Sequence, residues 1–182
     1  MQHAGRALID PFSIFAKIGL SKGMRVADLG CGRTGHFVFP AARIVDQTGV
    51  VYAVDILKDV LENINSWIRS EGLENVQTIW SDIEAVNKTP IPAKSLDVCF
   101  FMNVLFGIKN KTNALTEANR LLKDGGQIVI VDWQKKLATL GPSPELMVKP
   151  DEILTIANQI GLTLVEKIPV SDYHFCLIFK KI

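Results

Sequence analysis

The strongest constraint on the fold is a glycine-rich turn that directly follows a short apolar strand. Residues 25–30 form the predicted strand, and a G-x-G-x-x-G spacing then leads into a helix at Gly30, Gly32 and Gly35. Glycines permit a tight turn and the close approach of a ligand, because they carry no Cβ. The next predicted strand, 50–55, ends in an aspartate whose carboxylate can accept hydrogen bonds from both hydroxyls of a ribose. The two motifs together predict a site for a nucleoside-containing cofactor.

Asp28 indicates which cofactor this is. In a dinucleotide site the turn and the helix N-terminus hold a pyrophosphate, which a carboxylate two residues before the first glycine would repel. The same carboxylate suits the ammonium group of S-adenosylmethionine (SAM), while the helix N-terminus favours the carboxylate of its methionine half. Asp28 and Asp55 therefore favour SAM over NAD and make an NAD-dependent dehydrogenase the remote alternative.

Several motifs resemble those of class I SAM-dependent methyltransferases, in particular the small-molecule, ubiquinone/menaquinone-methyltransferase-like branch. V-A-D-L-G-C-G-R-T-G-H-F is similar to their first motif, and Y-A-V-D is similar to their second. L-D-V-C-F-F-M-N-V-L (96–105) resembles their fourth-strand motif, and R-L-L-K-D-G-G (120–126), followed by an apolar strand and D-W, resembles their ending. The resemblance runs in the family's order from about residue 19 onward.

The resemblance implies a set of cofactor-binding residues on the motifs that match. These are Asp28, Gly30, Cys31, Gly32, Gly35, Asp55, Ile56, Ser81, Asp82, Ile83 and Asn103, of which 81–83 would contact the adenine. Structural alternatives remain open for three of them. Asp55 is also explained as a strand-end cap, Asp82 as a turn residue, and Asn103 as a partner for backbone groups after its strand.

Strand and helix patterns alternate along almost the whole chain, which predicts an α/β, Rossmann-like doubly wound sheet of about seven strands. The last two strands have no helix between them, so the last should run antiparallel. Ligands bind beyond the carboxyl ends of the parallel strands in such folds. The predicted strands are 25–30, 50–55, 75–80, 96–102, 127–132, 162–168 and 174–180. Asp97 begins its strand at the opposite edge and is interpreted as structural.

We expect one domain, 1–182, in which residues 1–20 form a short N-terminal lid helix and 21–182 the catalytic core. The connection from Trp133 to Lys149 leaves the ligand edge and is longer than most, which suggests a substrate-side lid. An ordered surface loop is the alternative. The segment 84–95, with two prolines, is interpreted as plain loop.

Methyl transfer from a sulfonium needs alignment and exclusion of water, and a base only where the acceptor must lose a proton. Asp132, which ends the fifth strand, and His174, which begins the last one at the ligand edge, are the catalytic candidates. Asp132 is equally explained as a turn cap, and His174 as an exposed hairpin histidine without a role. His36 is interpreted as packing or adjacent to the cofactor. Many relatives read N-V-L-H where this chain has Phe106, which puts transfer to their substrate in doubt.

Composition narrows the acceptor. The formal net charge is +1 and no basic stripe interleaves with aromatics, which disfavours nucleic acid. Three cysteines without short spacing argue against a disulfide framework or a zinc site. The chain shows no signal-type run and no stretch of bilayer length, so we expect a cytoplasmic protein without a membrane span. A small, fairly apolar acceptor is expected, in a pocket that is open or completed by a partner subunit, as in a homodimer.

Two further functions remain open. One is an RNA methyltransferase on the same core, against which the near-neutral charge argues. The other is a SAM- or S-adenosylhomocysteine-binding module without transfer, which the thin N-terminal lid and Phe106 would suit.

Overall fold

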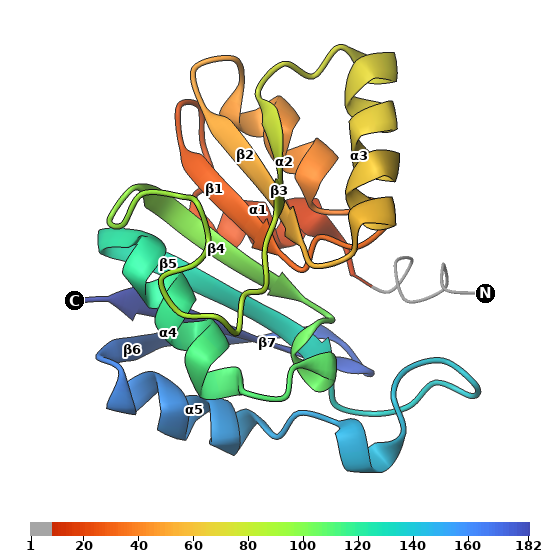
Figure 1. Ribbon diagram of the computed structural model, residues 1–182. Helices are drawn as coiled ribbons and strands as arrows, with labels where there is room; N and C mark the ends of the chain where they lie inside the picture. The colour runs from red at the N-terminus through yellow and green to blue at the C-terminus, as the bar shows by residue number, and fades with distance from the viewer. Residues whose placement is uncertain (1–8) are drawn as a thin grey trace.

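A seven-stranded sheet forms the centre of the protein (Figure 1). The structure is a computed structural model that describes residues 9–182, so the part of the predicted lid helix on residues 1–8 lies outside it. The strand order is β3-β2-β1-β4-β5-β7-β6, and β7 is antiparallel to both of its neighbours. The strands are β1 (Arg25–Leu29), β2 (Val50–Asp55), β3 (Val76–Trp80), β4 (Leu96–Met102), β5 (Leu122–Trp133), β6 (Leu162–Ser171) and β7 (His174–Lys181). The predicted doubly wound sheet and its antiparallel last strand are confirmed.

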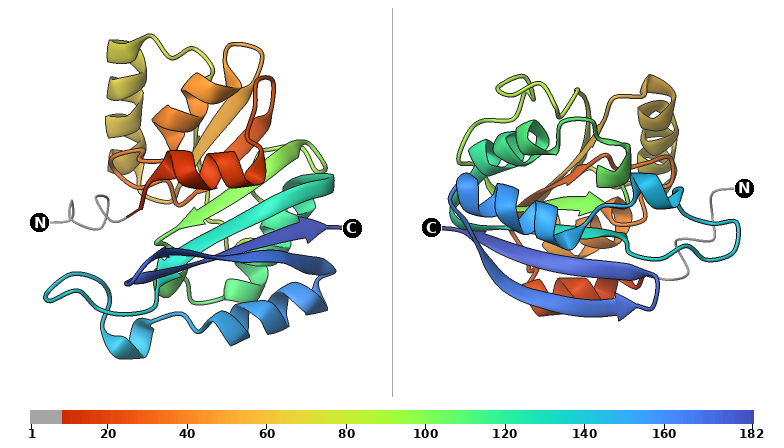
Figure 2. Two further views of the ribbon diagram at one scale, coloured as in Figure 1. Left: turned by 180° about the vertical axis from the view of Figure 1, so that it is seen from behind. Right: turned by 90° about the horizontal axis from the view of Figure 1, so that it is seen from below.

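Helices cover both faces of the sheet (Figures 1 and 2). One face packs against α1 (Pro11–Ile18), α2 (Val38–Val45) and α3 (Lys58–Glu71), and the other against α4 (Lys111–Leu121) and α5 (Pro150–Gln159). Successive strand residues point to opposite faces, so the two apolar clusters draw alternate residues from the same strands. A 3₁₀ turn, η1 (Leu105–Gly107), follows β4, and another, η2 (Pro144–Leu146), precedes α5.

The described part of the predicted lid is helix α1, and its sequence explains why it forms. Asp10 caps it by accepting from the backbone N–H groups of Phe12 and Ser13, at 3.1 and 3.2 Å. Its buried face contributes Phe15, which packs edge-on against Phe37 with ring centroids 5.6 Å apart. This contact fixes α1 over the same sheet face as the helix that follows the glycine turn.

Strand β5 begins at Leu122, five residues before the predicted start. Leu122 pairs with Leu96 and Gln127 pairs with Val98, so residues 123–126, which include Gly125 and Gly126, form the irregularity at this register shift. Gly125 and Gly126 therefore lie in an irregularity within one strand.

Two structural predictions about the remaining segments are confirmed. Asp97 accepts from the backbone N–H of Arg25 and from Lys123 Nζ, both at 2.7 Å, and so ties strand starts together at the edge opposite the glycine turn. The segment 84–95 contains no helix. Among the described helices, none is both long and apolar enough to cross a membrane.

Candidate cofactor and acceptor site

The glycine turn lies where the carboxyl ends of β1, β2 and β4 meet, as predicted. The backbone N–H groups of Gly30 and Cys31 both donate to the carbonyl oxygen of Val54, at 2.8 and 3.0 Å, which ties the turn to β2. Gly32 N–H donates to Asp55 Oδ2 at 3.1 Å. Gly32 and Asp55 are 23 positions apart in the chain, and this bond joins the two motifs into one unit.

The three glycines serve different purposes. Gly30 has a φ of +85°, and a Cβ there would lie 2.4 Å from Val104 Cγ2. A Cβ on Gly35 would lie 2.7 Å from the Phe39 ring, so helix α2 can pack closely only without it. Gly32 has a φ of +64° and no atom within 4 Å of the position its Cβ would take. Open space beside an exposed backbone is what a ligand needs in order to approach this turn.

Asp28 is a buried carboxyl group with an unsatisfied oxygen. It is 2 % exposed, and its Oδ1 has no hydrogen-bond partner among the described residues. Burial, together with the nearby charge of Asp55, raises the pKa of Asp28 to about 7. Burial and the same two carboxylates raise the pKa of the Cys31 thiol well above its usual range. A cationic group beside Asp28 would supply the missing partner, so the site fits the ammonium end of SAM.

Asp55 caps its strand end and still has acceptor capacity. Its Oδ1 accepts from the backbone N–H of Leu57 at 3.0 Å, in addition to the bond from Gly32. Each carboxylate oxygen has a further lone pair, so a ribose hydroxyl can bind as well. Ile56 is 55 % exposed at this strand end, and its carbonyl oxygen accepts from Trp80 Nε1 at 2.8 Å.

The segment after β3 combines a buried and an exposed side. Ser81 and Ile83 are buried, whereas Asp82 is exposed. Asp82 Oδ1 accepts from the backbone N–H of Glu84 at 2.9 Å, so its role as a turn residue is observed. One carboxylate oxygen of Asp82 stays available for a ligand.

Asn103 follows β4 in a conformation that non-glycine residues seldom adopt. Its φ is +53°, its backbone N–H donates to the Val131 carbonyl oxygen at 2.8 Å, and its Oδ1 is buried without a partner in the described chain. The backbone bond accounts for the main chain only, so it does not satisfy the side chain. Strain and an unsatisfied buried oxygen at one residue are typical of a binding site.

The two catalytic candidates do not come together. In the β5–β7 register Trp133 is paired with His174, and Asp132 is paired with Phe175. Neighbouring residues of a strand point to opposite faces, so Asp132 faces α4 and α5 while His174 faces the α1 side.

Asp132 is fully buried and accepts from the backbone. Its Oδ2 accepts from Phe106 N–H at 3.3 Å and its Oδ1 from Trp133 N–H at 2.8 Å, so it fixes η1 against β5. Burial raises its pKa to about 6, even though these backbone hydrogen bonds lower it.

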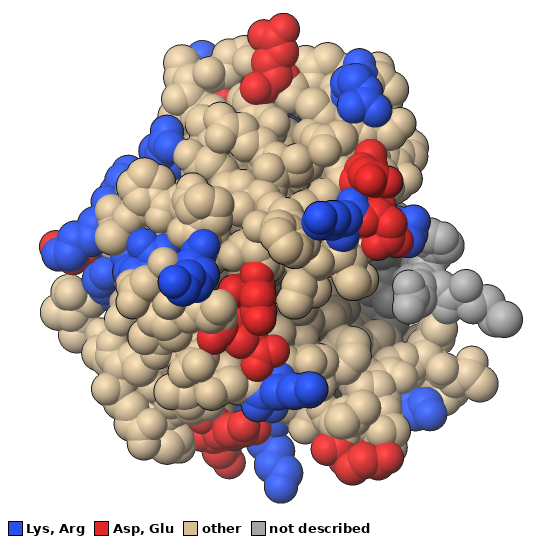
Figure 3. Space-filling model, in the orientation of Figure 1, with Lys and Arg blue, Asp and Glu red and all other residues tan. Residues whose placement is uncertain are grey.

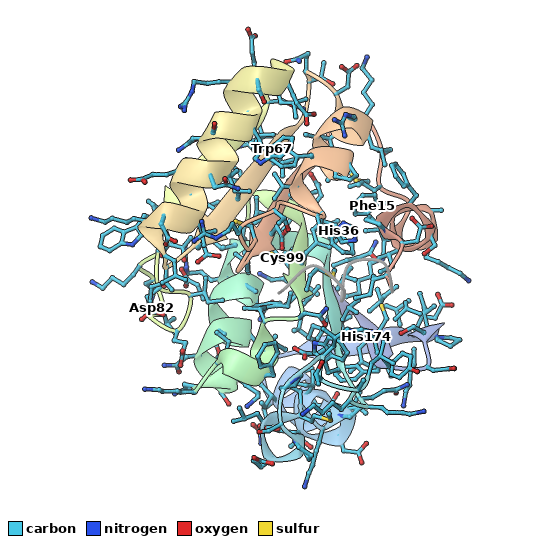
Figure 4. All side chains as sticks on the ribbon, turned by 90° about the vertical axis from the view of Figure 1, so that its right-hand side faces the viewer. Phe15, His36, Trp67, Asp82, Cys99 and His174 are labelled. Carbon is cyan, nitrogen blue, oxygen red and sulfur yellow. The ribbon has the colours of Figure 1, made fainter. Side chains whose placement is uncertain are left out.

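The expectation that a His174 without a role would be exposed is wrong, because the side chain is completely buried. Its ring lies 4.1 Å from that of Trp133, and Nδ1 is 3.1 Å from Ser171 Oγ. Nε2 has no partner within the described structure. Burial lowers the pKa of His174 to about 4, so the ring is neutral at pH 7. Figure 4 shows Asp82 and His174 toward opposite sides of the view.

His36 has a packing role, as expected. Its Nε2 lies 2.9 Å from the carbonyl oxygen of Ile9, and its ring packs edge-on against Phe37. Phe15 of α1 packs against the same Phe37 ring, and Figure 4 labels both His36 and Phe15. His36 therefore joins the glycine turn to the segment that enters α1.

A cavity that the sequence did not reveal lies between η1 and the segment before α5. It has a volume of about 730 Å³ and is lined by Phe106, Gly107, Ile108, Lys109, Lys111, Glu145, Leu146, Met147, Lys149 and Glu152. Part of the lining comes from the connection predicted to be a lid. No local pattern marks these residues, because two distant loops must meet to enclose the space. No cluster of three metal-ligating side chains occurs within residues 9–182.

Comparisons with known proteins agree with this geometry. Residues 20–161 match the family described as "Methyltransferase domain". The chain is 32 % identical over 121 residues to the ubiquinone/menaquinone biosynthesis C-methyltransferase UbiE of Erwinia tasmaniensis, covering 64 % of this chain and 45 % of the relative. It is 34 % identical over 107 residues to aklanonic acid methyltransferase DauC of a Streptomyces species, and the match covers 58 % of this chain and 46 % of that protein. The chain thus spans about half the length of the curated relatives it matches.

Among solved structures, a SAM-dependent methyltransferase from Aquifex aeolicus superposes with a TM-score of 0.86 at 26 % identity, covering 96 % of this chain and 91 % of that one. Another match, a methyltransferase-type protein from Sulfolobus solfataricus at 24 % identity and a TM-score of 0.76, supports the fold alone.

Proposed function

The chain belongs to the methyltransferase domain family, and from this premise we propose that it transfers a methyl group from SAM to a small-molecule acceptor. The observation that carries the proposal is the buried Asp28 carboxyl group, whose Oδ1 has no partner in the described chain beside an open glycine turn. A pyrophosphate would be repelled there, whereas an ammonium group would be held.

Residues at the carboxyl ends of β1, β2, β3 and β4 would hold the cofactor. The methionine half would be held by Asp28 and by the turn at Gly30, Cys31, Gly32 and Gly35. The ribose would bind to Asp55 and Ile56, and the adenine to Ser81, Asp82 and Ile83. Between these groups, Asn103 would contact the middle of the cofactor. When bound, SAM supplies a methyl group that its sulfonium already activates. The protein then has to orient the acceptor and exclude water.

The acceptor would bind at the carboxyl ends of β4 and β5. The cavity between η1 and the 133–149 connection offers room for a small molecule, and its apolar residues (Phe106, Ile108, Leu146 and Met147) suit a fairly apolar one. In the proposal this connection and α1 act as lids, within a single domain.

His174 and Asp132 have different proposed roles. His174 does not line this cavity and faces the α1 side of the sheet, so its neutral Nε2 would accept a hydrogen bond from a polar group bound at the strand ends on that side. Asp132 acts as a positioning residue, because it holds the backbone of Phe106 in the cavity wall.

The remaining expectations stay part of the proposal. On the face shown in Figure 3, basic and acidic residues are interspersed, which supports a small-molecule acceptor rather than RNA.

A homodimer would explain why Phe12 of α1 is 57 % exposed. Light scattering would measure the mass of the particle. A cytoplasmic location remains a prediction.

Thermal unfolding with SAM, S-adenosylhomocysteine or NAD tests the cofactor. A ligand at 100 times its dissociation constant stabilises by about 2.7 kcal/mol and raises the midpoint by several degrees. We expect a shift with SAM and S-adenosylhomocysteine and none with NAD. Asp55→Ala should cost about 1.5–3 kcal/mol of SAM binding, whereas Asp124→Ala, an exposed control at the far edge, should cost none.

Transfer is then measured with methyl-labelled SAM over a panel of small phenols, amines and carbon acids. SAM binding without transfer to any of them would favour the non-catalytic binding module. Absence of SAM binding would refute the proposal.

A further inference from the structure

A buried ionised carboxylate lies outside the cofactor site, in the middle of α4. Glu117 is completely buried. Its two oxygens accept from Arg120 Nε and Nη2, at 2.8 and 2.7 Å, and from the backbone N–H groups of Asn87 and Thr89, at 2.7 and 3.0 Å. Burial raises the pKa of Glu117, but these hydrogen bonds outweigh it and lower the pKa to about 2. The carboxylate is therefore charged and its bonds are strong.

Apart from Arg120, which lies on α4 itself, the partners of Glu117 belong to the loop between β3 and β4. Arg120 Nη2 also donates to the carbonyl oxygen of Thr89 at 3.1 Å. Glu117 therefore binds backbone N–H groups of the loop, while Arg120 binds a backbone carbonyl oxygen of the same loop. The loop's own backbone hydrogen bonds close only single turns, so the contacts with α4 fix how the loop lies against the helix.

The hydrogen bonds continue from this loop to the segment after β3. The backbone N–H of Thr89 donates to Glu117 Oε1 at 3.0 Å, and the Thr89 side chain is 3 % exposed. The Ser81 hydroxyl, itself 8 % exposed, donates to Thr89 Oγ1 at 3.3 Å. Ser81 directly precedes Asp82 and Ile83. A chain of buried hydrogen bonds therefore runs from Glu117 through Thr89 to Ser81.

A second set of contacts fixes the other end of the same segment. The backbone N–H of Asn110 donates to Glu84 Oε2 at 2.6 Å, and Asn113 Nδ2 donates to the Glu84 carbonyl oxygen at 3.1 Å. Asp82 and Ile83 thus lie between two points that are both anchored to α4 or its N-cap.

We propose that Glu117 is a positioning residue that sets the selectivity of the site for adenine, by fixing residues 81–83 through Thr89 and Ser81. The inference rests on the proposed function, in which this segment contacts the base. Adenine and hypoxanthine differ in the donors and acceptors of one edge, so discrimination requires hydrogen-bonding groups held to within a few tenths of an ångström.

The test compares two ligands that differ only in the base, S-adenosylhomocysteine and S-inosylhomocysteine. Their dissociation constants are measured by calorimetry for the full chain and for Glu117→Gln and Thr89→Val, at a temperature where circular dichroism shows each protein folded. Glu117→Gln should reduce the preference for adenine about tenfold. Thr89→Val, which keeps the shape but loses the hydroxyl, should reduce it several-fold.

Asp97→Asn is the matched control. Asp97 is also a carboxylate that accepts from a backbone N–H and a cation, but at the opposite edge of the sheet. The Asp97→Asn substitution should lower the midpoint of thermal unfolding and leave the preference for adenine unchanged. This result would separate a positioning effect from a loss of stability.

The outcomes separate this inference from the proposed function. If the preference for adenine is unchanged in both variants, or if the unmodified protein binds the two ligands equally, the role of Glu117 is overturned and the proposed function is not affected. If Glu117→Gln does not fold, the preference of Thr89→Val for adenine tests the inference instead. Failure of the unmodified protein to bind S-adenosylhomocysteine refutes the proposed function, and the inference with it.

Discussion

Asp132 and His174 lie on opposite faces of the sheet although they come from directly paired strands. The register pairs Trp133 with His174, so one residue of β5 separates the carboxylate from the face that carries the imidazole. Both groups are buried, yet burial shifts their pKa values in opposite directions, to about 6 and about 4. Their effects on stability should therefore have opposite dependences on pH.

Asp132 should make the protein less stable as the pH rises. Its pKa is about 6 in the fold against 3.8 unfolded, so its favourable contribution is complete below pH 3.8 and is lost as the pH rises through 6. The difference in unfolding free energy between the wild type and Asp132→Asn should change by about 2–3 kcal/mol between pH 4 and pH 7. Urea unfolding across this range measures it, and parallel curves for the two proteins would contradict the prediction.

His174 should have the reverse effect. Its pKa is about 4 in the fold against 6.5 unfolded, so its contribution is present above pH 6.5 and is lost as the pH falls through 4. His174→Phe should remove about 3 kcal/mol of this dependence while the ring contact with Trp133 is kept. The same urea titrations test it. The double variant with Asp132→Asn should show both changes together.

Gly32→Ala should separate ligand binding from stability. Gly32 and Gly72, which ends α3, have φ values of +64° and +65°, and neither has an atom within 4 Å of a Cβ. Alanine at either position should cost about 1–2 kcal/mol of stability, because of the backbone conformation alone. Only Gly32→Ala should also weaken SAM binding, by tenfold or more, since its Cβ enters the space beside the turn. Equal SAM affinities for the two variants would show that this space does not receive the ligand.

SAM affinity should rise with pH because of Asp28. Its pKa is about 7 without ligand, so below pH 7 binding of an ammonium group must displace a proton. Between pH 7 and pH 5.5 the affinity should fall by up to tenfold per pH unit. Asp28→Asn should bind SAM more weakly and lose this dependence. Calorimetric titrations of both proteins over this range measure the two slopes, and equal slopes would argue against Asp28 as the partner of the ammonium group.

The sheet and the glycine turn could be predicted because their signals are local. The apolar strand before Gly30 and the aspartate at the end of β2 each occupy a few consecutive residues, and the topology of an open α/β sheet then brings them together. The antiparallel last strand follows from the absence of a helix before it.

Burial and side-chain partners could not be predicted in the same way. His174 is covered because Trp133 of the paired strand packs on it, and nothing beside it in the sequence indicates this. Glu117 meets the backbone of Asn87 and Thr89 across 30 and 28 positions of the chain. The cavity wall likewise joins two loops. Such features depend on long-range contacts, which a pattern within one segment does not contain.

The position of β7 between β5 and β6 also constrains how the protein is made. During synthesis β1 to β5 can pair as soon as they emerge, but β5 then has an open edge until residues 174–181 have left the ribosome. An unpaired strand edge in a partly made chain favours aggregation. The strand that covers the edge of β5 is the last of the seven to be translated, so protection of the middle of the sheet depends on residues that are made late.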